Sequence, residues 1–155
     1  MKVREIMTRD VLTARPDTSV NRIAQLMQSR AVSGIPVVDA AGQLLGLVTE
    51  LDLIAGNQRL EPPQFFALLD GRIPLETPGH YRKRLRHMLG THAAEVMTDE
   101  VVSVEADAEV EDLAALMVKR GANPVPVVER GRLVGIVSRA DIVRMMAPEL
   151  AAEGA

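Results

Sequence analysis

Two short segments of the sequence place a hydroxyl side chain three residues before an aspartate, directly after an apolar run. The first contains Thr49 and Asp52, and the second contains Ser138 and Asp141. At a helix N-terminus, free N–H groups and a hydroxyl can bind an anion, and a carboxylate one turn later can accept both hydroxyls of a ribose. A nucleoside phosphate needs those two contacts side by side. The same spacing is also typical of a capping box, in which the acid serves the backbone at the start of a helix.

These two segments close two copies of a repeat of about 50 residues. The copies cover 3–54 and 93–143. With a one-residue deletion near Ala40, the following positions align: Met7 with Met97, Thr8 with Thr98, Pro36 with Pro126, Gly46 with Gly135, and Asp52 with Asp141. A repeat of this length predicts two copies of one supersecondary unit that bury their faces against each other. We therefore expect the functional site where the copies meet.

Each repeat is predicted to contain a short strand, a helix, two strands and a closing helix. The first strand is expected over 11–13, and the turn at 16–18 carries residues typical of a helix start. Apolar residues then recur at i, i+3, i+4 and i+7, as Val20, Ile23, Ala24 and Met27 in one copy and Val110, Leu113, Ala114 and Met117 in the other. A hairpin is expected over 35–38 and 44–48, and again over 125–128 and 133–137.

Between the copies lies a segment that holds every aromatic residue of the chain: Phe65, Phe66 and Tyr81. Its residues 64–70 follow two prolines and predict a short helix. A second helix is expected from Thr77 to Gly90, with a basic face that includes Arg82. That face is interpreted as a solvated surface, a phosphate-neutralising patch or a partner-binding patch. The predicted organisation is 1–56 and 93–147 for the repeats, 57–92 for a helical insert and 148–155 for a flexible tail.

Composition excludes several classes of function. The chain has 155 residues, is 47% hydrophobic and carries a formal charge of −3, so we expect a globular protein without general attraction to nucleic acid. No apolar run approaches a membrane span and the first residues lack a signal peptide, which predicts a cytoplasmic location without membrane contact. With 0 cysteines, no thiol nucleophile or thiolate zinc site is available. The three histidines lack a spacing that converges on a metal. We therefore expect neither a metal site nor an enzyme.

The ordered combination of the helix stripe, the IPVV and VPVV strands and the G-x-x-[ST]-x-x-D ending, occurring twice, resembles a tandem pair of CBS domains, the module named after cystathionine β-synthase. The resemblance implies an α/β (α+β) fold of two β-α-β-β-α units packed as a pseudo-twofold pair. It also implies two clefts that bind AMP, ADP, ATP or S-adenosylmethionine, with no cofactor required. CBS pairs commonly form homodimers, and a sensor of this kind would signal to a protein partner.

The resemblance assigns roles to matching positions of both repeats. It implies ribose binding by Asp52 and Asp141 and phosphate contact by Thr49 and Ser138. The remaining candidate site residues would line the adenine pocket, with the last two on the first strand of each unit: Val32, Ser33, Ala122, Asn123, Leu12 and Val102. Ordinary core packing is the alternative for the apolar members of this set.

The sequence departs from the family pattern just before the central prolines. Some nucleotide-binding members carry basic residues there, whereas this chain has Ser33, Gly34, Asn123 and Pro124. Phosphate neutralisation would then come from Arg30, Lys119, Arg120, Arg139 or the basic face of the insert. If none of these reaches a cleft, S-adenosylmethionine is favoured over ATP.

Two hypotheses for function follow. The first is a stand-alone regulatory module that senses an adenosine-containing ligand and signals to a partner. The alternative is a structural or protein-interaction module whose motifs only cap helices and bind no nucleotide. An enzyme is disfavoured because no nucleophile with an attendant base is evident.

Overall fold

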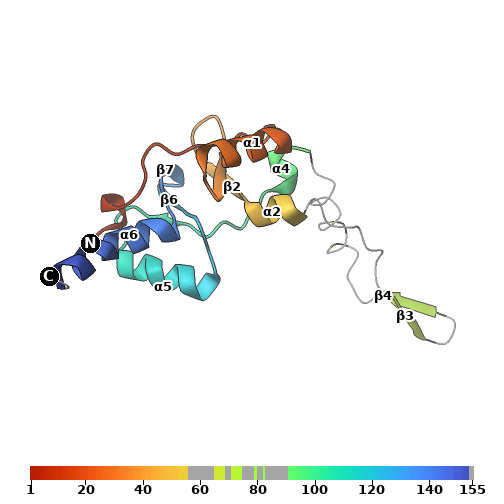
Figure 1. The fold of residues 1–155 in the computed structure, drawn as a ribbon. Helices are drawn as coiled ribbons and strands as arrows, with labels where there is room; N and C mark the ends of the chain where they lie inside the picture. Colours follow the sequence, from red (N-terminus) through yellow and green to blue (C-terminus); the bar gives the residue numbers. More distant parts are fainter. Residues whose placement is uncertain (56–64, 69–70, 75–78, 80–81, 83–90, 154–155) are drawn as a thin grey trace.

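Two mixed helix-and-strand units lie side by side in the computed structural model, which describes residues 1–55, 65–68, 71–74, 79, 82 and 91–153 (Figure 1). The elements of the first repeat are α1 (Val20–Arg30), β1 (Gly34–Val38), β2 (Leu44–Thr49) and α2 (Glu50–Ala55). Those of the second are β5 (Val104–Glu105), α5 (Val110–Arg120), β6 (Val125–Glu129), β7 (Arg132–Val137) and α6 (Arg139–Glu153). The predicted fold class is therefore confirmed.

Helices α1 and α5 each place one apolar stripe against a hairpin. The hydroxyl of Ser19 accepts a hydrogen bond from the amide of Arg22 at 3.1 Å and caps α1. Ile23 and Met27 are buried, as are Leu113 and Met117 of α5. One member of the predicted stripe is wrong, because Ala24 is exposed and Leu26 packs on the core in its place.

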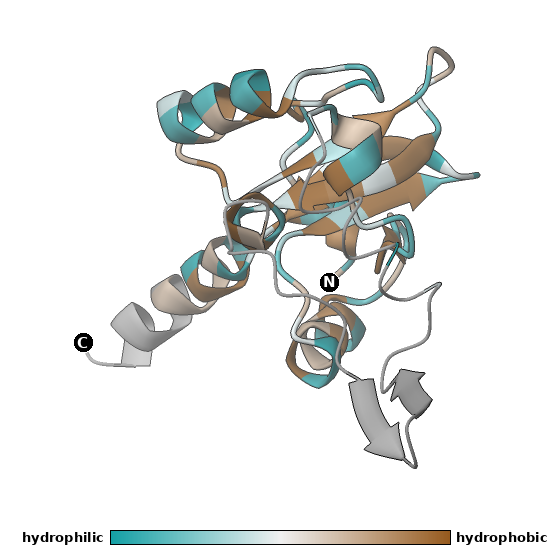
Figure 2. Cartoon of the chain, turned by 90° about the vertical axis from the view of Figure 1, so that its right-hand side faces the viewer, coloured by the Kyte–Doolittle hydropathy of each residue, from teal (hydrophilic) through white to brown (hydrophobic). Residues whose placement is uncertain are grey.

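The two hairpins are antiparallel and share a register. Ile35 pairs with Val48 in the first, and Val125 pairs with Val137 in the second. All four of these residues are completely buried. Each hairpin carries an irregularity at the same place, after Val37 and after Val127. The strands are therefore apolar on both faces, as expected for the centre of each unit, and Figure 2 shows apolar residues concentrated along them.

The strand expected over 11–13 is absent from the described structure. The backbone instead makes an isolated parallel bridge one residue later, between Ala14 and Val37. In the second repeat the corresponding strand is β5, and Val102 precedes it. The placement of Leu12 and Val102 on strands was therefore wrong. Leu12 lines one cleft between the units and Val102 lines the other.

Each repeat begins with a segment that packs on the other repeat. The turn η1 (Val3–Glu5) buries Val3 completely in the core of the second unit. Conversely α4 (Ala93–Val96) buries Ala93 and Val96 in the core of the first. Figure 1 shows this exchange, with the red N-terminal turn beside the blue and cyan elements and the green α4 beside the orange α1. The packing units therefore differ from the linear repeats.

The exchanged segments make equivalent backbone hydrogen bonds. The amide of Val3 donates to the carbonyl of Ala108 at 2.9 Å, and the amide of Ala93 donates to the carbonyl of Thr18 at 2.8 Å. Further along, Thr8 exchanges two hydrogen bonds with Ile136, of 2.9 and 3.0 Å. Thr98 makes the same pair with Leu47, also of 2.9 and 3.0 Å. Each segment is thereby fixed on the partner hairpin before it reaches the space between the units.

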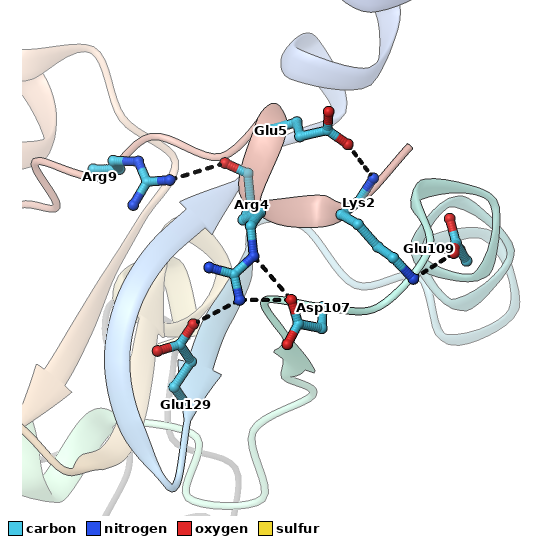
Figure 3. A network of polar contacts seen from close by, with 7 residues as sticks. All are labelled: Lys2, Arg4, Glu5, Arg9, Asp107, Glu109 and Glu129. Atoms are coloured by element: carbon cyan, nitrogen blue, oxygen red, sulfur yellow. Dashed lines mark hydrogen bonds and ion pairs between the residues drawn. The ribbon is translucent and has the colours of Figure 1, made fainter.

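Charged side chains reinforce the exchange at the N-terminus (Figure 3). The ammonium of Lys2 pairs with Glu109 at 2.5 Å, and the guanidinium of Arg4 contacts Asp107 at 2.6 Å and Glu129 at 3.1 Å. The hydrogen bond from Lys2 holds the pKa of Glu109 below its usual range, and the same contact raises the pKa of Lys2. These contacts are solvent-exposed, so they orient the segment more than they stabilise it.

The insert differs from the sequence-based expectation, and the last helix extends into the segment expected as a tail. Residues predicted as a helix over 64–70 include β3 (Phe65–Leu68), which pairs antiparallel with β4 (Gly71–Pro74). Two consecutive phenylalanines favour a strand, and Phe66 pairs with Ile73 of β4. The basic helix expected from Thr77 falls largely outside the described residues. Helix α6 continues to Glu153, into the expected flexible tail, because alanine, leucine and glutamate favour helix there.

Candidate functional site

Among the described residues, two clefts lie between the units, and each takes residues from both repeats. The first has a volume of about 1010 Å³ and the second a volume of about 350 Å³. Ser33, Glu50, Asn123, Pro124 and Arg139 line both clefts. The clefts therefore meet around the equivalent loops that precede β1 and β6, where a Cβ on Gly34 would lie 2.8 Å from the ring of Pro124.

The first cleft combines the apolar half of one repeat with the polar motif of the other. Leu12, Val32 and Ser33 come from the first repeat, and Ser138 and Asp141 come from the second. These five residues are all sequence-predicted site residues. Their proximity follows from the packing of the repeats, because the first three residues lie more than 100 positions before the last two along the chain.

The second cleft gathers four predicted residues of the equivalent set. Val102, Ala122 and Asn123 come from the second repeat, and Thr49 comes from the first. Asp52 is the exception, since it does not line the described cleft and is 8% exposed. The two motifs look equivalent in the sequence, but in the structure Asp141 lines a cleft and Asp52 does not.

Asp52 is engaged by hydrogen bonds from both repeats. Its Oδ2 accepts from the amide of Thr49 at 2.8 Å and from the Thr49 hydroxyl at 3.1 Å. The amide of Asp52 lies 3.4 Å from the same hydroxyl, which completes the capping arrangement at the start of α2. Its Oδ1 accepts from the hydroxyl of Thr98 at 3.4 Å.

Asp141 has the same local geometry and a different outer partner. Its Oδ2 accepts from the amide of Ser138 at 2.7 Å and from the Ser138 hydroxyl at 3.1 Å. Its Oδ1 lies 3.0 Å from the guanidinium of Arg144, one turn along α6. The Arg144 side chain is 75% exposed, whereas that of Asp141 is 11% exposed. The carboxylate therefore lies at the cleft wall with a solvent-facing counter-ion.

Three of the four predicted arginine and lysine candidates outside the insert reach a cleft. Arg30 and Arg139 line the first cleft, and Arg120 and Arg139 line the second. Lys119 lines neither of the described clefts. Acidic side chains accompany them, namely Asp10 and Glu50 in the first cleft and Glu50 and Glu100 in the second. The amide of Arg139 donates to Asn123 Oδ1 at 2.9 Å, which fixes the start of α6 against the loop before β6.

Sequence reasoning missed two threonines at these clefts. Thr8 lines the first cleft and Thr98 lines the second. The repeated Met-Thr pair at 7–8 and 97–98 is the available signal. Its position along the chain gives no indication that the Thr98 hydroxyl reaches Asp52 of the other repeat.

Within the described residues, no group of three or more histidine or acidic side chains is placed to hold a metal ion. None of the described helices combines the length and apolar character that a membrane crossing needs.

The chain is similar to a known protein family and to several of its members. The family model of the CBS domain matches residues 3–56 and 93–148. The CBS domain-containing protein YhcV of Bacillus subtilis is 31% identical over 150 residues, which covers 96% of this chain and 89% of that protein. Protein MJ1426 of Methanocaldococcus jannaschii is 29% identical, with 94% and 91% covered. Some relatives are longer, and the chain spans 62% of the chloroplastic protein CBSX1 of Arabidopsis thaliana at 31% identity.

Solved structures share the whole fold. The structure of CBSX2 in complex with AMP has a TM-score of 0.79 at 25% identity, covering 95% of this chain and 97% of that one. The CBS domain pair of protein MJ0100, in complex with 5′-methylthioadenosine and S-adenosyl-L-methionine, has a TM-score of 0.70 at 23% identity, covering 96% and 98%.

Proposed function

Because this chain belongs to the CBS-domain family, we propose that it is a regulatory module that senses an adenosine-containing ligand between its two repeats. One observation carries the proposal. The first cleft places the Ser138 hydroxyl and the Asp141 carboxylate opposite the apolar residues Leu12 and Val32 of the other repeat. A nucleoside phosphate has the same sequence of chemical groups, from apolar base through ribose to anion.

Each group of the proposed ligand has a matching group in the first cleft. The ribose hydroxyls can donate to Oδ1 of Asp141, because Oδ2 already accepts two hydrogen bonds from Ser138 and each carboxylate oxygen has two lone pairs. Leu12 and Val32 cover the faces of the adenine ring. The Ser138 hydroxyl and the N-terminus of the 15-residue helix α6 favour the phosphate.

The charges of the first cleft favour a ligand with a small number of phosphates. Arg30 and Arg139 supply two guanidinium groups, which form strong charge-assisted hydrogen bonds with phosphate. Asp10 and Glu50 line the same cleft and oppose them. We therefore favour AMP over ATP. The likeness to a CBS pair in complex with AMP agrees with this choice.

Signalling would follow from the position of the ligand between the repeats. A ligand that binds Ser138 and Leu12 together stabilises one relative angle of the two units, provided that it binds the alternatives with different affinity. We propose that the resulting change is passed to a protein partner. The module itself would act by binding and would catalyse no reaction.

A homodimer is part of the proposal. Among the described residues, exposed large apolar side chains gather on the two closing helices, with Leu51 and Ile54 on α2 and Val143 and Met146 on α6. Contiguous exposed apolar patches mark interaction surfaces, and we propose that these helices contribute to one. The molecular mass in solution, measured for the wild type and for a Leu51→Glu, Val143→Glu variant, tests this point.

The second candidate is an interaction module that binds no nucleotide. It is favoured by the capping hydrogen bonds of Thr49 with Asp52, which already occupy one carboxylate oxygen. In that case the motifs would contribute about 0.5–2 kcal/mol each to stability and nothing to ligand affinity.

Titration calorimetry with AMP, ADP, ATP and S-adenosylmethionine separates the candidates. The test compares wild type with an Asp52→Ala, Asp141→Ala variant. An Asp17→Ala, Asp112→Ala variant is the matched control, since it removes one exposed carboxylate from each repeat outside both described clefts. Saturable binding that the first variant loses and the control retains supports the sensor. Absence of binding to all four ligands in the wild type would favour the interaction module.

A further inference from the structure

The two clefts are unequal, and we infer that one adenosine ligand binds per chain, in the first cleft, while Thr98 keeps the second site closed by holding Asp52. The inference rests on the proposed function and specifies which of its two possible sites operates. It concerns residues that the sequence presents as equivalent, because Thr8 aligns with Thr98 and Asp52 aligns with Asp141.

Both carboxylate oxygens of Asp52 accept hydrogen bonds within the protein. Oδ2 accepts from the amide and hydroxyl of Thr49, and Oδ1 accepts from the hydroxyl of Thr98 at 3.4 Å. A ribose hydroxyl at Oδ1 would therefore compete with Thr98. Since Asp52 does not line the described cleft, a ligand in that cleft meets Thr98 first.

Thr98 cannot easily move aside. Its amide and carbonyl form two hydrogen bonds with Leu47 of β2, of 2.9 and 3.0 Å. The preceding residue, Met97, packs its thioether on Gly46 of the same strand. Displacement of Thr98 would therefore break backbone pairing and side-chain packing at once.

Asp141 is held differently. Thr8 lines the first cleft but donates no hydrogen bond to Asp141 in the described structure, where the partners of this carboxylate are Ser138 and Arg144. Arg144 lies on the same helix and its side chain is 75% exposed, so it can rotate into solvent. Oδ1 of Asp141 can then accept a ribose hydroxyl without any change of backbone.

The cleft volumes point in the same direction. The first cleft has about 1010 Å³ and the second about 350 Å³. Ligand pockets of proteins usually measure about 300–1,000 Å³. The first cleft is large enough for a nucleotide and some solvent. The volume of the second cleft is near the lower end of this range, with Thr98 bound to the Asp52 carboxylate.

Calorimetric stoichiometry with AMP tests the inference. We expect one AMP per wild-type chain, and we expect Asp141→Asn to weaken that binding at least tenfold, with no second saturable event. Two AMP molecules per wild-type chain would overturn the inference and leave the proposed function standing. Retention of one tight site by Asp141→Asn would do the same. Failure of the wild type to bind any adenosine ligand would overturn both.

Thr98 provides an independent test that does not depend on the stability of the Asp141 variant. Thr98→Ala removes the hydroxyl and the bulk that cover Asp52, whereas Thr98→Ser keeps the hydroxyl. We expect Thr98→Ala to bind a second AMP and Thr98→Ser to bind one. A single site in Thr98→Ala, with its fold verified by circular dichroism, would contradict the role assigned to Thr98.

Discussion

The thioether of Met97, in the second repeat, packs directly on the backbone of Gly46, in the first. Met7 and Gly135 make the equivalent contact in the opposite direction. A Cβ on either glycine would lie within van der Waals overlap of a methionine sulfur, and a Cβ on Gly46 would also lie 3.0 Å from the carbonyl oxygen of Thr98. Glycine at these positions therefore allows each exchanged segment to approach the other repeat's hairpin.

Replacement of these glycines should destabilise the fold. We expect Gly46→Ala and Gly135→Ala each to lower the free energy of unfolding by about 1–3 kcal/mol, because the added methyl group overpacks a filled contact. Urea denaturation measures the effect. Gly79→Ala is the control, since an added Cβ there meets nothing within 4 Å. Equal stability of all three variants would show that Met7 and Met97 adjust without cost.

The N-terminal turn should support the second repeat more than its own. Val3 is completely buried in the core of the second unit. We expect Val3→Ala to cost about 1–3 kcal/mol through lost burial and a residual cavity. Val118→Ala, at a position that is 87% exposed, should change stability by no more than about 0.5 kcal/mol.

Hydrogen exchange locates this effect of Val3→Ala along the chain. Amide protection should fall first in α5 and β6, which surround the buried Val3 side chain. Loss of protection confined to α1 and β1 would contradict the exchanged packing.

The contact between Lys2 and Glu109 should make a small, pH-dependent contribution to stability. The lowered pKa of Glu109 means that its contribution is present above the ordinary value of 4.5 and is lost as the pH falls through the pKa of the folded state. The raised pKa of Lys2 means that its contribution is present below 10.5 and is lost as the pH rises through its folded-state pKa.

Thermal unfolding as a function of pH measures this contact. The difference between wild type and Glu109→Gln should be greatest between these limits and should vanish at low pH. It should also shrink in about 1 M salt, where the screening length is about 3 Å. A difference that persists at pH 2 and high salt would indicate packing in place of charge.

Arg139 should recognise the phosphate of the proposed ligand. It lines both clefts, and it follows Ser138 directly at the start of α6. A hydrogen bond to a charged group contributes about 1.5–3 kcal/mol. We therefore expect Arg139→Gln to weaken AMP binding by about 10- to 100-fold and to leave adenosine binding unchanged.

Calorimetry with AMP and with adenosine makes this comparison. Lys119→Gln removes an equal charge outside both described clefts and is the control. Equal loss of AMP and adenosine affinity in Arg139→Gln would show that Arg139 supports the fold of the site and makes no phosphate contact.

Local patterns in the sequence predicted most of the regular elements. The spacing of Ile23 and Met27 indicated α1, and the apolar runs around Pro36 and Pro126 indicated both hairpins. Such patterns succeed because helix and strand periods are decided by neighbours along the chain. The same reasoning failed at Phe65, where proline and glycine at the ends of the segment suggested a helix and the residues form a strand paired with β4.

The sequence by itself determined that two similar units exist, that each ends in a hydroxyl and an aspartate three residues apart, and that these motifs begin helices. Only the tertiary structure decided which repeat each opening segment packs on, which residues face each cleft, and that Asp52 meets Thr98. The physical reason is that capping and the pairing of Asp141 with Arg144 on the same helix are local, whereas the contact of Thr98 with Asp52 comes from packing between the repeats. Two nearly identical motifs therefore acquire different surroundings, and that difference can be measured as one bound ligand or two.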